Sequence, residues 1–140
     1  MLTNTEAAAL LSEDKIIAAN IRWHATGGKH SESYTLEVTV LAPSSNTALR
    51  LTGRKGKRNR SFALLFGGDP VKMITVHAVH RNPDGTLIRE PHKHTWDETY
   101  EDRQAYVPDD ISFGDINREF QDFLKQCNIR LLGTYTSIMP

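Results

Sequence analysis

Histidines are the residues of this 140-residue chain that point most directly to chemistry. Four of the six lie between His77 and His94, in two pairs separated by the turn sequence Asn82-Pro83-Asp84-Gly85. If the flanking segments are the strands of one hairpin, the four imidazoles lie close together in space. Imidazole has the side-chain pKa nearest neutrality and is the commonest metal ligand in proteins. The sequence therefore predicts a reactive or metal-binding site here, without identifying a substrate.

The alternation of side chains along a strand selects three of these histidines. Successive residues of a strand point to opposite faces, so His92 and His94 share a face with Trp96. His80 lies at the mouth of the turn and is the third candidate. His77 falls on the opposite face of a regular strand and joins the group only if a bulge intervenes.

Two kinds of chemistry suit this trio. The H-x-H pair can chelate a divalent transition metal such as zinc, and His80, Asp84 or Glu90 can supply a third ligand. Such a site keeps a position open for water, as catalytic metal centres do. Alternatively, two neighbouring imidazoles can act as acid and base in RNA cleavage without a metal. His80, His92, His94 and Asp84 are the catalytic candidates.

The same residues also have non-catalytic interpretations. His92 and His94 can be exposed polar positions on an edge strand. Their ring N–H groups can instead donate to the carboxylates of Asp84 or Asp97 and fix the hairpin. A third interpretation is that the imidazoles shape a surface that binds a ligand or a protein partner.

A second cluster is basic. Within eleven residues the chain places six cations, two glycines and no acid, although its formal net charge is zero. Such a patch attracts phosphate backbones of RNA or DNA. The alternative is a solvated loop whose charges protect a sheet edge. The nucleic-acid-binding candidates are Arg54, Lys55, Lys57, Arg58 and Arg60.

An acidic and aromatic segment, Trp96 to Asp102, follows the histidines. Its carboxylates can orient metal-bound imidazoles from a distance. It can equally be a solvated loop, or a surface that docks against a basic partner. Asp109 and Asp110 precede the last predicted helix and are expected to interact with its N-terminal dipole.

The elements that position these residues follow from hydrophobic periodicity. Thr3 and Glu6 form a capping box for a first helix that continues to about Asn20. Strands are predicted at 34–40, 48–51, 61–66 and 71–79, followed by the histidine hairpin. A second helix is predicted from Ser112, its N-cap, to Gln126, with an apolar face of Phe113, Ile116, Phe120, Phe123, Leu124 and Cys127. The expected fold is a single α+β domain over residues 1–140, in which an antiparallel sheet of about five to seven strands is flanked by the N-terminal and C-terminal helices.

Composition narrows the class of protein. Hydrophobic residues make up 39% and charged residues 24%, as in ordinary globular domains. No apolar run approaches the roughly 18 residues of a membrane span, and the N-terminus lacks the basic region of a signal peptide. We therefore expect a cytoplasmic protein with no membrane partner. The single cysteine, Cys127, excludes an internal disulfide and is expected to be buried.

Four motifs resemble those of a family of small prokaryotic proteins described as a domain of unknown function. They are H-R-N-P-D-G from His80, P-H-K-H-x-W from Pro91, D-R-Q-A-Y from Asp102 and F-L-K-Q-C-N-I from Phe123. The resemblance extends from the first helix to the last motif. It departs at Val79, where the family has proline, at Gln104, where it has an aromatic residue, and in the extra residues 132–137. It implies a shared fold but no activity. The D-G-T-L-I…H-K-H arrangement is also faintly similar to TumE-type toxins of toxin–antitoxin pairs.

Two functional hypotheses follow. In the first, this is a small intracellular prokaryotic or phage protein directed at nucleic acid: an RNase-like toxin or a nucleic-acid binder of a toxin–antitoxin or defence system, with a histidine-dependent or metal-dependent nuclease site. In the second, it is a non-enzymatic protein-interaction module, such as a regulator or a phage counter-defence protein. They differ in whether the imidazoles converge on an open pocket beside the basic hairpin.

Overall fold

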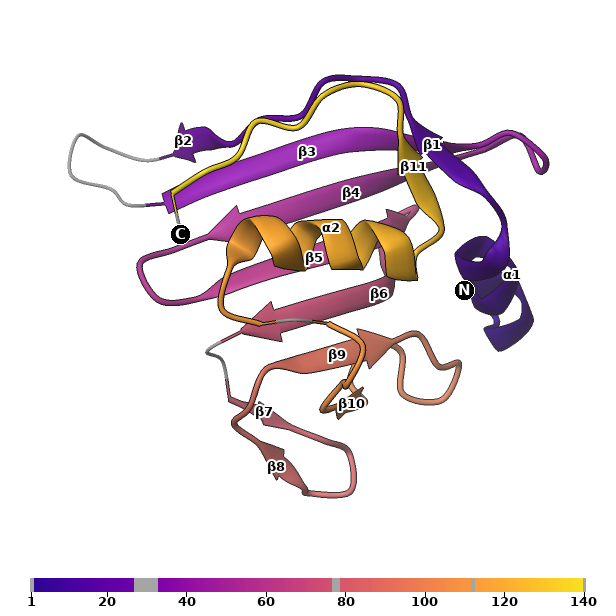
Figure 1. Ribbon diagram of the computed structural model, residues 1–140. Helices are drawn as coiled ribbons and strands as arrows, with labels where there is room; N and C mark the ends of the chain where they lie inside the picture. Colours follow the sequence, from indigo (N-terminus) through magenta and orange to yellow (C-terminus); the bar gives the residue numbers. More distant parts are fainter. Residues whose placement is uncertain (1, 27–32, 77–78, 112, 140) are drawn as a thin grey trace.

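A large sheet with two helices makes up the computed structural model, which describes residues 2–26, 33–76, 79–111 and 113–139 (Figure 1). The fold is α+β, as predicted, although strands predominate. The elements in chain order are α1 (Asn4–Ser12), β1 (Lys15–Ile17), β2 (His24–Thr26), β3 (Ser33–Ala42), β4 (Thr47–Lys55), β5 (Arg60–Phe66), β6 (Asp69–Val76), β7 (His80–Arg81), β8 (Leu87–Ile88), β9 (His92–Thr95), β10 (Ala105–Tyr106), α2 (Ile116–Gln126) and β11 (Ile129–Leu131).

The sheet is larger than the sequence predicted. In the described parts of the chain, nine strands form one sheet in the order β10-β9-β6-β5-β4-β3-β1-β11, with β2 also beside β3, and β7 pairs separately with β8. The pairing is antiparallel except between β1 and β11, which run parallel. The prediction of a wholly antiparallel sheet was therefore wrong at this edge, because residues 15–17 pair with residues near the other end of the chain.

The first helix is shorter than predicted. The capping box of Thr3 and Glu6 is confirmed, since each side chain accepts a hydrogen bond from the other residue's backbone N–H. The helix ends at Ser12 rather than near Asn20. The buried Lys15 ammonium stops it by donating to the backbone carbonyls of Leu11 and Glu13 at 3.1 and 2.7 Å, which satisfies the helix's C-terminal end.

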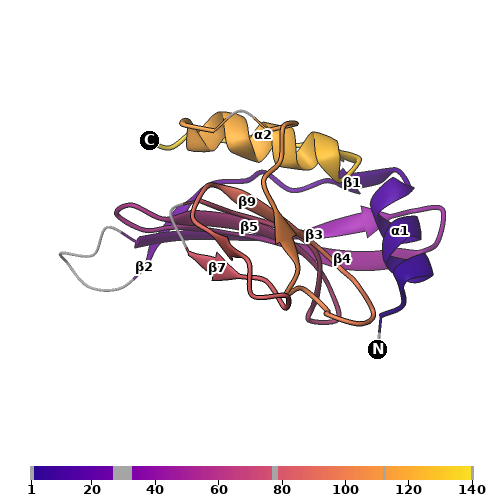
Figure 2. The same ribbon diagram turned by 90° about the horizontal axis from the view of Figure 1, so that it is seen from below.

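The second helix covers one face of the sheet (Figure 2). Its apolar side was predicted correctly: Phe120 and Phe123 are fully buried, with ring centroids 5.4 and 6.1 Å from that of Phe62. The start of this helix was predicted wrongly, because Asp115 is the N-cap and its carboxylate accepts a hydrogen bond from the Asn117 backbone N–H. The predicted N-cap Ser112 lies outside the described residues. Neither helix of the described chain is long and apolar enough to span a membrane.

The sheet thus has two unlike faces. Phe62 of β5 points toward α2, so its neighbour Ser61 points to the opposite side. We call that side the open face: Figure 2 shows no helix lying across its centre, with α1 at one end of the sheet and β7 beneath β9. Cys127 lies on the helix-covered side, where burial raises the pKa of its thiol to about 12, as expected of a structural cysteine.

Candidate functional site

The three candidate histidines come from two separate sheets. His92 and His94 lie on β9, which pairs with β6 on one side and β10 on the other, and both point to the open face. His80 lies on β7, opposite Ile88 of β8. The prediction of one hairpin carrying both pairs was therefore wrong, because β8 takes the place expected for β9. His77 lies outside the described residues.

The tertiary fold nevertheless brings the three rings together. One ring nitrogen from each of His80, His92 and His94 lies within 4.8 Å of those of the other two. The ring centroids are 4.6 Å apart for His80 and His94, 5.0 Å for His92 and His94, and 5.5 Å for His80 and His92. Among the described residues this is the cluster of possible metal ligands that the fold assembles.

Each ring is held by a backbone carbonyl. His92 Nδ1 lies 3.0 Å from the carbonyl oxygen of Glu90, and His94 Nδ1 lies 2.5 Å from that of Asp102. His80 Nε2 lies 2.6 Å from the carbonyl oxygen of Arg103.

These contacts fix the tautomers. A carbonyl oxygen only accepts hydrogen bonds, so each contacting nitrogen must carry the proton. The lone pairs are thereby left on His92 Nε2, His94 Nε2 and His80 Nδ1, as in metal sites where the second ring nitrogen is held by a carbonyl.

Burial keeps two of the rings neutral. His92 and His94 are only 2% and 4% exposed, which excludes the interpretation that they are exposed positions on an edge strand. Burial lowers the pKa of His92, and lowers that of His94 from 6.5 to about 4. Neutral imidazole is the form that binds a metal.

A shallow pocket of about 290 Å³ opens onto the rings. Besides the three imidazoles it is lined by Met73, Thr75, Val79, Asp102 and Arg103. The fourth catalytic candidate is elsewhere: the exposed Asp84 carboxylate accepts the backbone N–H of Thr86 at 2.9 Å and shapes the turn. That hydrogen bond lowers the pKa of Asp84. The alternative in which the rings donate to Asp84 or Asp97 was wrong, since backbone carbonyls hold all three.

The neutral histidines predict a pH dependence of stability. Because the pKa of His94 is lower in the folded chain than in the unfolded one, the unfolded state takes up its proton first as the pH falls. The free energy of unfolding should therefore decrease between about pH 6.5 and pH 4, with His94 contributing roughly 3 kcal/mol. Urea unfolding with a chelator present measures this, and His94→Asn should flatten the profile in that range. Identical profiles for the two proteins would contradict the shift.

The basic candidates are divided between the two faces. The exposed Arg54 side chain lies on the open face, whereas Lys55 lies on the other, 5.8 Å from the centre of the Tyr34 ring. Lys57 and Arg58 are exposed in the turn between β4 and β5. The residues therefore form no single surface.

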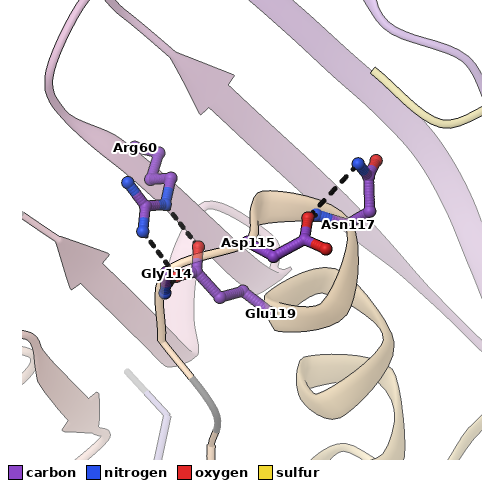
Figure 3. A network of polar contacts seen from close by, with 5 residues as sticks. All are labelled: Arg60, Gly114, Asp115, Asn117 and Glu119. Carbon is purple, nitrogen blue, oxygen red and sulfur yellow. Dashed lines mark hydrogen bonds and ion pairs between the residues drawn. The ribbon is translucent and has the colours of Figure 1, made fainter. Parts of the chain in front are cut away.

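Arg60 forms an ion pair with a buried carboxylate beneath α2 (Figure 3). Its guanidinium binds the carboxylate of the fully buried Glu119 on α2, through Nε and through Nη2, the latter at 2.6 Å. The backbone N–H of Gly114 donates to the same carboxylate at 3.0 Å. A nucleic-acid role predicted for Arg60 competes with this ion pair.

The acidic segment is mostly structural. Trp96 is buried and its indole N–H donates to the Leu2 carbonyl at 2.6 Å. Glu98 accepts the backbone N–H of Asn4, so the segment holds the start of α1. Asp110, expected at the dipole of the last helix, instead pairs with Lys93 at 2.7 Å.

Sequence reasoning missed two contributions to the site. Asp102 and Arg103 act through their carbonyl oxygens, which no side-chain pattern reveals. Thr75 was also missed, although the alternation of Ile74 with Met73 and Thr75 was a usable signal that these two point away from the core.

Comparison with known proteins supports the family resemblance. Residues 2–129 match the family described as "Family of unknown function (DUF6978)". Neither the curated proteins nor the solved structures gave a match, and the similarity to TumE-type toxins found no support. Since the matched segment covers most of the chain, from just before α1 to the first residue of β11, the chain belongs to the DUF6978 family of unknown function.

Proposed function

We propose that this protein is a metal-dependent enzyme that acts on nucleic acid, with His80, His92 and His94 as the metal ligands. The observation that carries the proposal is the convergence of three imidazoles, each of which has one ring nitrogen held by a backbone carbonyl and the other left as a possible ligand. Three histidines and one open position make up the ligand set of catalytic zinc. A metal there would supply a Lewis acid and lower the pKa of a bound water.

The geometry requires only a small adjustment. Two nitrogens about 2.0–2.1 Å from a tetrahedral zinc lie roughly 3.4 Å apart, so the rings would move closer than the 4.8 Å span they have now. His80 can make this movement, because it is half-buried and lies on the small β7–β8 sheet.

Metal-free catalysis by His92 and His94 as an acid–base pair is less favoured than metal binding. An acid–base pair needs one protonated imidazole near the working pH. The pKa values of His92 and His94 are both lowered by burial, so both rings are neutral at pH 7. Neutral rings bind metal better than they donate protons.

Nucleic acid is the favoured substrate because a cation lies near the pocket. A second hollow, of about 510 Å³, is lined by Arg54 and by Thr75, which also lines the histidine pocket. Phosphate groups bind such cations. The cytoplasmic location and the toxin–antitoxin, phage or defence setting stay predictions.

A metal titration tests the proposal. The chelator-treated protein should bind one Zn²⁺ per chain by calorimetry, and Co²⁺ should give the visible absorption of a tetrahedral site. Single-stranded RNA or DNA should be cleaved by the metal-loaded protein and not by the chelated one. Binding without cleavage would favour the rival hypothesis, a non-enzymatic interaction module with a structural metal. Absence of binding would overturn the metal site.

A further inference from the structure

A row of polar residues crosses the open face from the basic hairpin to the histidine pocket. Arg54 of β4 pairs with Ser61 of β5, Ser61 with Thr75 of β6, and Thr75 with His92 of β9. Paired residues of neighbouring antiparallel strands project from the same face. The four side chains therefore form a continuous line, which we call the Arg54–His92 row.

Exposure decreases along this row. Arg54 is exposed, Ser61 and Thr75 are half-buried, and His92 is buried. The hollow beside Arg54 is lined by Ser61 and Thr75, and Thr75 also lines the histidine pocket. The two hollows are thus neighbours, and the row leads from an exposed cation to the buried ring of His92.

Arg54, the cation at the start of the row, differs from two neighbouring arginines in its ion pairing. Arg50, on the same strand and face, forms an ion pair with Glu37. Arg60 is paired with Glu119. In the part of the chain that the structure describes, no carboxylate forms an ion pair with Arg54.

We propose that a single strand of nucleic acid lies along the Arg54–His92 row, with one phosphate at Arg54 and another at the three histidines. This rests on the proposed function of the histidine site. Adjacent strands lie about 4.8 Å apart, so three strand steps separate the ends of the row by roughly 14 Å.

The burial of the His92 and His94 rings favours a single strand over a duplex. A phosphate must enter a pocket of about 290 Å³ to reach rings that are 2% and 4% exposed. A flexible single strand can bend into it, whereas a duplex holds its phosphates on a rigid cylinder. Apart from the buried His92 ring, the row contains two hydroxyls and a cation and no Phe, Tyr or Trp on which bases could stack, so binding depends on the backbone and shows little sequence preference.

Matched arginine variants test the proposal. Fluorescence anisotropy is measured with a labelled single-stranded 12-mer and its duplex, with chelator present to prevent cleavage. The single strand should bind more tightly, and Arg54→Gln should weaken it several-fold and reduce the log–log salt slope by about one. Arg50→Gln, on the same strand and face, should change neither. If the duplex binds as tightly as the single strand, or if Arg54→Gln and Arg50→Gln weaken binding equally, the proposal that a single strand lies along the row is wrong.

A crosslink tests the path itself. Ser61→Cys places a thiol in the middle of the row, and the native Cys127 is buried, with its pKa raised to about 12, so it does not compete for a thiol label. A benzophenone at position 61 should crosslink the 12-mer. The same label on Thr39→Cys, exposed and opposite Arg50, should not. Crosslinking from position 39 alone would contradict the path.

Cobalt absorption, measured on chelator-free samples of the same proteins, separates two failures. If the protein binds Co²⁺ through its histidines but shows no Arg54-dependent binding of the strand, the metal site is supported and the proposed path of the nucleic acid is contradicted. If the protein binds the strand through Arg54 but binds no metal, the proposed metal-dependent activity is contradicted. The role of His92 as the end of the row is then contradicted as well.

Discussion

Alanine in place of His94 is expected to lower the affinity for Zn²⁺ by at least about a hundredfold. Loss of groups that merely orient a metal ligand lowers affinity about 10- to 100-fold, and removal of a ligand has a larger effect. His94 is also the ring with the shortest carbonyl contact, 2.5 Å to Asp102. Calorimetric titration with Zn²⁺ measures the change. His24→Ala is the matched control, because His24 is an exposed histidine on β2 outside the cluster.

Thermal unfolding distinguishes this effect from simple damage to the fold. At a Zn²⁺ concentration about 100 times the dissociation constant, the wild-type protein should gain roughly 2.7 kcal/mol of stability, and His94→Ala should gain almost none. His80→Ala should lose the same zinc response at a smaller cost in folding, because His80 is only half-buried. A full zinc response in both variants would exclude these rings as ligands.

Alanine in place of Arg60 is expected to destabilise the protein by about 3 kcal/mol. The variant leaves the Glu119 carboxylate fully buried without its cation, and such unpaired charges are among the most destabilising changes known. The midpoint of urea unfolding should fall while its slope stays the same. Arg58→Ala, an exposed residue of the adjacent turn, should change stability by less than about 0.5 kcal/mol.

A double variant shows whether burial of the charge is the cause. Arg60→Met with Glu119→Leu removes both charges and keeps apolar volume, so it should be more stable than Arg60→Ala alone. If the double variant is as unstable as the single one, the ion pair does not explain the loss. If Arg60→Ala folds normally and also abolishes nucleic-acid binding, the assignment of Arg60 to the core is wrong.

The division of the basic cluster was predictable in part. Arg60 is two and four residues from Phe62 and Leu64, so strand alternation alone places it on the apolar face, toward the helix. Arg54 stands between Gly53 and Lys55 on β4, and neighbouring residues of a strand point to opposite faces. Because these two neighbours point to the helix-covered face, Arg54 points to the open face. The six basic residues were grouped because they lie close together in the sequence. Closeness in the sequence does not show to which face of a strand each side chain points.

The histidine site was predictable only in its residues. The H-x-H spacing correctly put His92 and His94 on one face, and the cluster formed with His80 as expected. The route by which it formed was not predictable, since β9 pairs with β6 across the intervening β7–β8 hairpin. Such non-local pairing leaves no periodic signal in a single sequence, and neither do the carbonyl oxygens that hold the rings.

The parallel pairing of β1 with β11 has a consequence for how the chain folds. Lys15 lies opposite Ile129, so this edge of the sheet closes only when more than a hundred intervening residues are available. Contacts between such distant residues carry a high loop-closure entropy and slow folding. On the ribosome, the hairpins from β3 to β6 can pair while synthesis continues. β1 must wait for residues 129–131 to leave the exit tunnel, and until then its outer edge stays free to pair with another chain.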